Sequence, residues 1–192
     1  VNAIVFGCVL IGAGWTVRVQ YFILGALGLS LISFFWGAFQ DFQPARLAEN
    51  WNPNFQGGNS FATMFALFFP AVTGIEAGLG LSGDLKNPAK ALPLGTLAAV
   101  VTGYIVYMAL PVFLSAKVQN PDILLVDLNI MSSIARWGSL IVLGVIAASL
   151  SSALGSLLGA PRMLQALAND RVIPRFIGRG FGKDKADPRI AT

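Results

Sequence analysis

The chain of 192 residues contains no histidine, a single cysteine and few charged side chains, which make up 11% of the sequence. Ordinary soluble domains carry about 25% charged residues, so this composition points away from that class. Cys8 has no partner for an internal disulfide and therefore says nothing about the redox compartment. Because a serine nucleophile needs a base, which is usually histidine, the chain alone carries no Ser-His hydrolase site.

Long uncharged runs take the place of the missing charges. They cover residues 1–17, 19–40, 50–75, 91–116 and 137–161, which are 17, 22, 26, 26 and 25 residues long. About 20 apolar residues cross a bilayer as a helix. The sequence therefore predicts an all-α integral membrane protein with one bundle of five spans, at about 2–15, 20–39, 61–84, 93–116 and 136–168.

The two ends of the sequence do not resemble natural termini. Val1 leads directly into an apolar segment with no Met, charged leader or small-residue cleavage site, so we do not expect this segment to be a signal peptide. Apolar residues begin to return in the segment 188–192. We therefore expect a fragment of a larger membrane protein.

The distribution of Lys and Arg predicts the orientation of the spans, because cytoplasmic loops carry an excess of these residues. With a turn through Arg18 on the cytoplasmic side, the same side holds the connection Asp84–Leu92 and the tail from 169 to 189. With Arg162, at the cytoplasmic end of the last predicted span, ten basic residues then lie on that side and three on the other. We expect a plasma membrane or bacterial inner membrane. The basic tail is interpreted as a flank of the membrane, with no nucleic acid as a partner.

The connecting segments carry recognisable start and stop signals. Residues 45–51 are predicted as one short helix in a loop that Pro44, Pro53 and two glycines punctuate. Asn59 or Ser60 is predicted to cap the helix that follows. Pro93 is predicted in the first turn of the next span, and residues 117–134 are predicted as a second outer loop.

The segment FATMFALFFPAVTGIEAGLGLSGD, residues 61–84, predicts a span that is broken in its middle by Pro70 and four glycines. A break inside lipid leaves backbone groups without helical partners, and these must lie in protein or face a polar cavity. Pro70 frees a carbonyl, Thr73 adds a hydroxyl, and amides after Gly74 point toward an anion. The alternative is a plain proline kink.

Two further groups of residues are candidates for chemistry. Ala148, Ser151 and Ser152 share one helix face, so oxygen atoms there could bind a hard cation. The alternative is close helix packing, because small residues recur along this helix. Glu76 is the only acid within a predicted span and could carry a proton. The alternative is a hydrated acid in a cytoplasmic vestibule.

The stretches FFPAVTGI, SGDLKNP and GAPRMLQALANDRVIP resemble cation-chloride cotransporters of the sodium-potassium-chloride type, within the amino acid-polyamine-cation transporter superfamily. The resemblance covers nearly the whole chain and implies a LeuT-like inverted-repeat fold. It implies potassium contacts at Pro70 and Thr73, chloride contacts at the amides of Gly74, Ile75 and Glu76, and sodium contacts at Ala148, Ser151 and Ser152. Glu76 departs from the family, which usually has an apolar residue there.

The resemblance favours a secondary active, sodium-coupled cation-chloride symporter, with Na, K and Cl as its partners besides the bilayer. The alternative is an amino-acid or polyamine permease of the same superfamily, proton-coupled through Glu76. No cofactor and no metal beyond alkali cations is expected, and a homodimer is the expected assembly. An enzyme is the competing class, because GLSG at Gly80–Gly83 matches the GxSG of rhomboid-type intramembrane proteases. A non-transporting scaffold is a third hypothesis.

Overall fold

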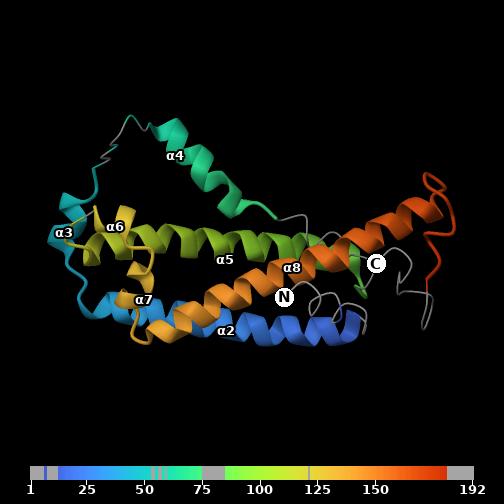
Figure 1. Cartoon of the computed structure of the whole chain (residues 1–192), viewed down its shortest axis with the longest axis horizontal. Helices are drawn as coiled ribbons and strands as arrows, with labels where there is room; N and C mark the ends of the chain where they lie inside the picture. The colour runs from blue at the N-terminus through green and yellow to red at the C-terminus, as the bar shows by residue number, and fades with distance from the viewer. Residues whose placement is uncertain are drawn as a thin grey trace. The chain divides into compact units, whose positions relative to one another are not determined.

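The computed structural model describes residues 7, 13–52, 55, 58, 60–74, 85–120 and 122–180. All regular secondary structure among them is helical, as predicted. The elements are α2 (Ala13–Gln40), α3 (Pro44–Glu49), α4 (Phe61–Phe68), the 3-10 helix η1 (Phe69–Val72), α5 (Pro88–Lys117), α6 (Ile123–Val126), α7 (Ile130–Ile134) and α8 (Gly138–Asn169), shown in Figure 1.

Three helices of the described part are long and apolar enough to cross a membrane. They are Arg18–Gln40 within α2, the whole of α5 and the whole of α8. Most of the predicted span 2–15 and the second half of 61–84 lie outside the described residues. The remaining two of the five spans therefore stay predictions.

The structure corrects two predicted helix boundaries. The turn predicted through Arg18 is wrong, because α2 runs without interruption from Ala13. No proline or glycine lies between Trp15 and Val19, and a single charge does not end a helix. The start predicted at Pro93 is also wrong, because α5 begins at Pro88. The carbonyl of the preceding residue, Asn87, accepts hydrogen bonds from the amides of Lys90 and Ala91.

Other predicted boundaries lie closer to the observed ones. The short helix predicted at 45–51 is observed as α3, with Pro44 near its start. The helix predicted at 136–168 is observed as α8, Gly138–Asn169. The segment 117–134 was predicted as a loop but contains the short helices α6 and α7. Ser60 caps α4 as predicted, because its side chain accepts a hydrogen bond from the Thr63 amide at 3.4 Å.

The chain divides into two compact units, each with its own apolar core. The first contains the described parts of Val1–Leu27, Glu76–Thr96 and Val145–Thr192. In it, the N-terminal part of α2 packs on the later turns of α8. The buried side chains of this core are Ile23, Ala26, Ala147, Leu154 and Leu158.

The second unit contains the described parts of Gly28–Ile75 and Leu97–Gly144. Phe34, which is only 1% exposed, contacts Phe35 edge to face, and Phe35 contacts Phe113 of α5 in the same way with ring centroids 5.2 Å apart. Such aromatic pairs add stability beyond the area that they bury. At one end of α5, the Asn50 side chain after α3 donates to the Ser115 carbonyl at 2.9 Å.

A backbone contact fastens the start of α8 to α2 in this second unit. Ser33 is fully buried, and its hydroxyl accepts from the Trp137 amide at 2.9 Å while its carbonyl accepts from the Arg136 amide at 3.0 Å. The approach is close because Gly37 has no side chain: a Cβ there would overlap the backbone of 134–136. Small residues at such contacts are typical of helices in membranes.

Candidate functional site

The first half of the predicted broken helix ends close to Thr73. α4 tightens into the 3-10 turn η1, which contains Pro70 and ends at Val72. Thr73 is extended (φ −87°, ψ 172°), and Gly74 follows with φ of +97°. Glycine adopts this left-handed conformation without the steric cost that other residues meet. The backbone is therefore non-helical at Thr73 and Gly74, and residues 75–84 lie outside the described part.

Pro70 and Thr73, the two residues predicted to contact potassium, lie together. The Thr73 hydroxyl donates to the Pro70 carbonyl oxygen at 2.7 Å, and the Thr73 amide contacts the same oxygen at 3.3 Å. A carbonyl and a hydroxyl oxygen therefore stand side by side where the helix ends. Carbonyl oxygens that replace water around a cation are the usual means of binding potassium.

A cavity of about 680 Å³ lies between this turn and α5. Its lining from the turn is Phe68 and Ala71–Gly74, and its lining from α5 is mainly small or aromatic: Ala99, Val100, Gly103, Tyr104, Tyr107, Met108 and Pro111. A Cβ at Gly103 would meet no atom within 4 Å, so space remains open there. An open cavity beside the interrupted backbone is the setting in which such a break is tolerated in a membrane.

Tyr107 joins α5 to the turn and was not predicted as a site residue. Its hydroxyl donates to the carbonyl of Ala71 at 2.6 Å, and its ring meets Phe68 edge to face with centroids 5.7 Å apart. Ala71 lies in the 3-10 turn η1, directly after Pro70. A tyrosine in the middle of an apolar helix was the available signal, but its partner depends on the tertiary structure.

The predicted anion contacts are only partly within the described chain. Gly74 lies there, at the edge of the cavity, whereas Ile75 and Glu76 lie outside the described residues. Their amides, and the predicted proton coupling through Glu76, stay predictions. The GLSG segment at Gly80–Gly83 also lies outside.

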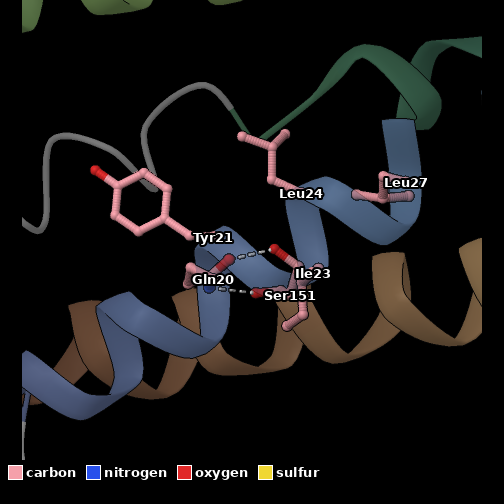
Figure 2. Close-up of a pocket in the computed structure, with 6 residues that line it drawn as sticks. All are labelled: Gln20, Tyr21, Ile23, Leu24, Leu27 and Ser151. Atoms are coloured by element: carbon pink, nitrogen blue, oxygen red, sulfur yellow. Dashed lines mark hydrogen bonds between the residues drawn. The ribbon is translucent and has the colours of Figure 1, made fainter. Parts of the chain in front are cut away.

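The residues predicted to contact sodium are all on α8. Ser151 is half-buried, whereas Ala148 and Ser152 are exposed. The Ser151 hydroxyl donates to Oε1 of Gln20 on α2 at 2.7 Å, and Nε2 of Gln20 donates back to the Ser151 carbonyl at 3.3 Å, as Figure 2 shows. Gln20 was not predicted as a site residue, although a polar residue inside an apolar span usually has a partner.

The alternative role of the small residues on α8, close packing against another helix, is observed at Gly144. A Cβ at Gly144 would overlap the Ser30 side chain, so this glycine allows α2 to approach. Gly155 and Gly159 face open space among the described residues. Close packing of this small-residue row against α2 is therefore observed at Gly144.

A charged group lies outside the apolar spans, at the end of α2 and α5. Lys117 pairs with Asp41, and Arg46 donates to the Lys117 carbonyl at 3.1 Å. The hydrogen bond and the charge of Lys117, and to a lesser extent the charge of Arg46, hold the pKa of the Asp41 carboxyl below its ordinary value of 3.8, whereas desolvation acts in the opposite direction. Within the described residues, no three His, Cys, Asp or Glu side chains gather in a way that could hold a metal ion.

Comparison with known proteins decides the family. The model of the family described as "Amino acid permease" matches residues 1–187. The chain belongs to the amino acid permease family. This membership confirms the predicted superfamily and, with the long apolar helices, an integral membrane protein.

The chain is also similar to several solute carriers. It is 37% identical to solute carrier family 12 member 8 of Homo sapiens over 93% of its length, 30% identical to member 1 of Mus musculus over 94%, and 31% identical to member 2 of Squalus acanthias over 94%. It spans 26%, 21% and 19% of these proteins. The permease family and these relatives are named for carrying solutes, and none of them is named as an enzyme.

Proposed function

We propose that the full-length protein is a secondary active transporter that couples the movement of sodium to that of potassium and chloride. Carriers of this kind bind their ions at broken helices near the middle of the bilayer. The observation that carries the proposal is the pairing of the Thr73 hydroxyl with the Pro70 carbonyl at 2.7 Å, at the end of a helix that opens on a cavity.

In this proposal the turn serves two ions of opposite charge. The carbonyl of Pro70 and the hydroxyl of Thr73 contact potassium, while the backbone amides of Gly74, Ile75 and Glu76 contact chloride. Carbonyls point toward the C-terminal end of a helix and amides toward the N-terminal end, so one interruption offers partial charges of both signs. The positive φ of Gly74 turns the chain immediately after Thr73, which supports such a reversal.

Sodium binds separately in this proposal, at the carbonyl of Ala148 and the hydroxyls of Ser151 and Ser152. Sodium is a hard cation, and hard cations prefer oxygen ligands. The placement of all three residues on one stretch of α8, with Ala148 and Ser152 exposed, supports it. No enzymatic activity is part of the proposal.

The test is radiotracer uptake by the full-length protein in liposomes. Uptake of labelled rubidium, as a substitute for potassium, and of labelled chloride should each rise when an inward sodium gradient is applied. Uptake of amino acids, driven by a proton gradient and independent of sodium, would replace this proposal with proton-coupled permeation through Glu76. Absence of uptake of any of these solutes would favour a scaffold.

The orientation is part of the same proposal. The residues around Arg18, the connection Asp84–Leu92 and the tail after Ala168 face the cytoplasm. A cysteine introduced at Arg175 should then react with an impermeant maleimide only after the membrane is opened, and one introduced at Glu49 should react in intact cells. Both residues are exposed in the structure. The reverse labelling pattern would invert the topology.

A further inference from the structure

A polar contact in the first unit joins α2 and α8, through Gln20 and Ser151. Two hydrogen bonds of opposite direction link these residues (Figure 2). Both residues are half-buried next to the apolar cluster that includes Ile23 and Leu154. A cavity of about 230 Å³ opens beside them and is lined by both, together with Tyr21, Leu24 and Leu27.

The geometry determines which end of the Gln20 amide faces the serine hydroxyl. The Ser151 carbonyl can only accept a hydrogen bond, so the Gln20 nitrogen must face it, as it does at 3.3 Å. The Gln20 oxygen is then left to face the Ser151 hydroxyl, and an amide oxygen can only accept. The hydroxyl proton therefore points toward Gln20.

This direction matters for cation binding. A serine hydroxyl has one proton and two lone pairs, and only the lone pairs can bind a cation. When the Ser151 hydroxyl donates its hydrogen bond to Gln20, both lone pairs of the serine oxygen remain available to bind a cation. In surroundings of low dielectric, the hydrogen bond also polarises the hydroxyl and increases the negative charge on its oxygen.

We propose that Gln20 is a positioning residue for sodium: its Oε1 accepts a hydrogen bond from the Ser151 hydroxyl, so that the serine oxygen presents its lone pairs to the ion. This inference rests on the proposed sodium site. Gln20 itself does not contact the ion in this proposal. It supports, from α2, a site whose proposed sodium contacts all lie on α8.

The competing explanation is that the pair only fastens α2 to α8. The two explanations differ in the substitution that each tolerates. Gln20→Met keeps the length of the side chain and suits the apolar neighbours, but it cannot hold the hydroxyl proton. Gln20→Glu keeps an oxygen acceptor but places a charge among apolar side chains. If Gln20 positions the Ser151 hydroxyl, function requires an oxygen acceptor at position 20, which Gln20→Glu keeps. If the pair only packs α2 on α8, the apolar side chain of Gln20→Met is tolerated better.

The experiment measures uptake of labelled sodium by the full-length protein in liposomes, as a function of sodium concentration. Gln20→Met should raise the sodium concentration at half-maximal uptake about 5-fold, as expected for the loss of one hydrogen bond. Gln20→Glu should keep it at or below the wild-type value. Ser149→Ala is the matched control, because that hydroxyl donates only within α8, to the Val145 carbonyl at 2.9 Å.

The outcomes separate this inference from the function on which it rests. If Ser151→Ala leaves the sodium dependence unchanged, the proposed sodium site is wrong and the inference fails with it. If Ser151→Ala changes the dependence but Gln20→Met does not, the site stands and only the role of Gln20 is wrong. Wild-type behaviour of Gln20→Met with impaired Gln20→Glu would identify the pair as packing.

Discussion

The hydroxyl of Tyr107 on α5 donates a hydrogen bond of 2.6 Å to the carbonyl of Ala71. Ala71 directly follows Pro70 in the turn η1, which ends the first half of the broken helix. The bond spans 36 positions of sequence and ties the cavity wall to the backbone beside the proposed potassium contacts. The position of the Pro70 carbonyl therefore depends on a side chain from another helix.

Tyr107→Phe should weaken the apparent affinity for rubidium, because it leaves the Ala71 carbonyl without its donor and loosens the turn. The loss of one hydrogen bond costs about 0.5–1.5 kcal/mol, which corresponds to roughly a 2–10-fold rise in half-saturation. Rubidium uptake by the full-length protein in liposomes measures it. Thr102→Val removes a hydroxyl from α5 outside the cavity lining and should have no effect. Equal behaviour of the two variants would show that Tyr107 does not support the site.

Gly37→Ala should destabilise the protein, because the added methyl group would overlap the backbone of 134–136 at the start of α8. Overpacking of this kind costs about 1–3 kcal/mol. The midpoint of thermal unfolding of the full-length protein in detergent should fall by several degrees. Gly28→Ala on the same helix is the control, since its Cβ would meet no atom within 4 Å. A stable Gly37→Ala variant would mean that α2 and the segment before α8 are farther apart.

Asp41→Asn should remove the pairing with Lys117 and give a small, pH-dependent effect. The folded pKa of Asp41 lies below its ordinary 3.8, so the pair stabilises the protein above pH 3.8 and loses this contribution as the pH falls through the lower, folded value. The thermal midpoints of wild type and variant should differ slightly at pH 7, and the difference should shrink as the pH falls below 3.8. A difference that does not change with pH would point to a cause other than charge.

Glu76→Gln tests whether the acid in the proposed anion site couples transport to protons. A carboxylate beside chloride would repel the anion, so transport should rise as the pH falls and the repulsion is removed. The neutral glutamine imitates the protonated acid. Its pH-rate profile should therefore be flatter than that of wild type, with transport preserved at acidic pH. Identical profiles for the two proteins would reject the coupling role.

The local features of the break could be predicted from sequence, because proline, glycine and capping residues act through their own backbone. Ser60 caps α4 as expected, and the helix ends beyond Pro70, with Gly74 in a conformation that suits glycine. Two boundaries failed for a related reason. The turn predicted at Arg18 lies where no neighbouring residue breaks a helix, and α5 begins at Pro88, five residues before the predicted Pro93.

The partners of the site residues could not be predicted in the same way. Gln20 and Ser151 are separated by 131 positions, and Tyr107 and Ala71 by 36. No periodicity or spacing within one segment indicates which polar side chain on another helix will meet it. These contacts depend on how the helices pack, and small residues such as Gly144 set the distance between them.

The most direct test of the proposed function is ion-dependent uptake by the full-length protein carrying either Thr73→Ala or Ser152→Ala. The proposed potassium and sodium sites are separate, so each variant should lose affinity for one cation and keep it for the other. Thr73→Ala should raise the half-saturation for rubidium and leave that for sodium near wild type, and Ser152→Ala should do the reverse. If uptake by both variants shows wild-type dependence on rubidium and on sodium, the proposed cation sites are wrong.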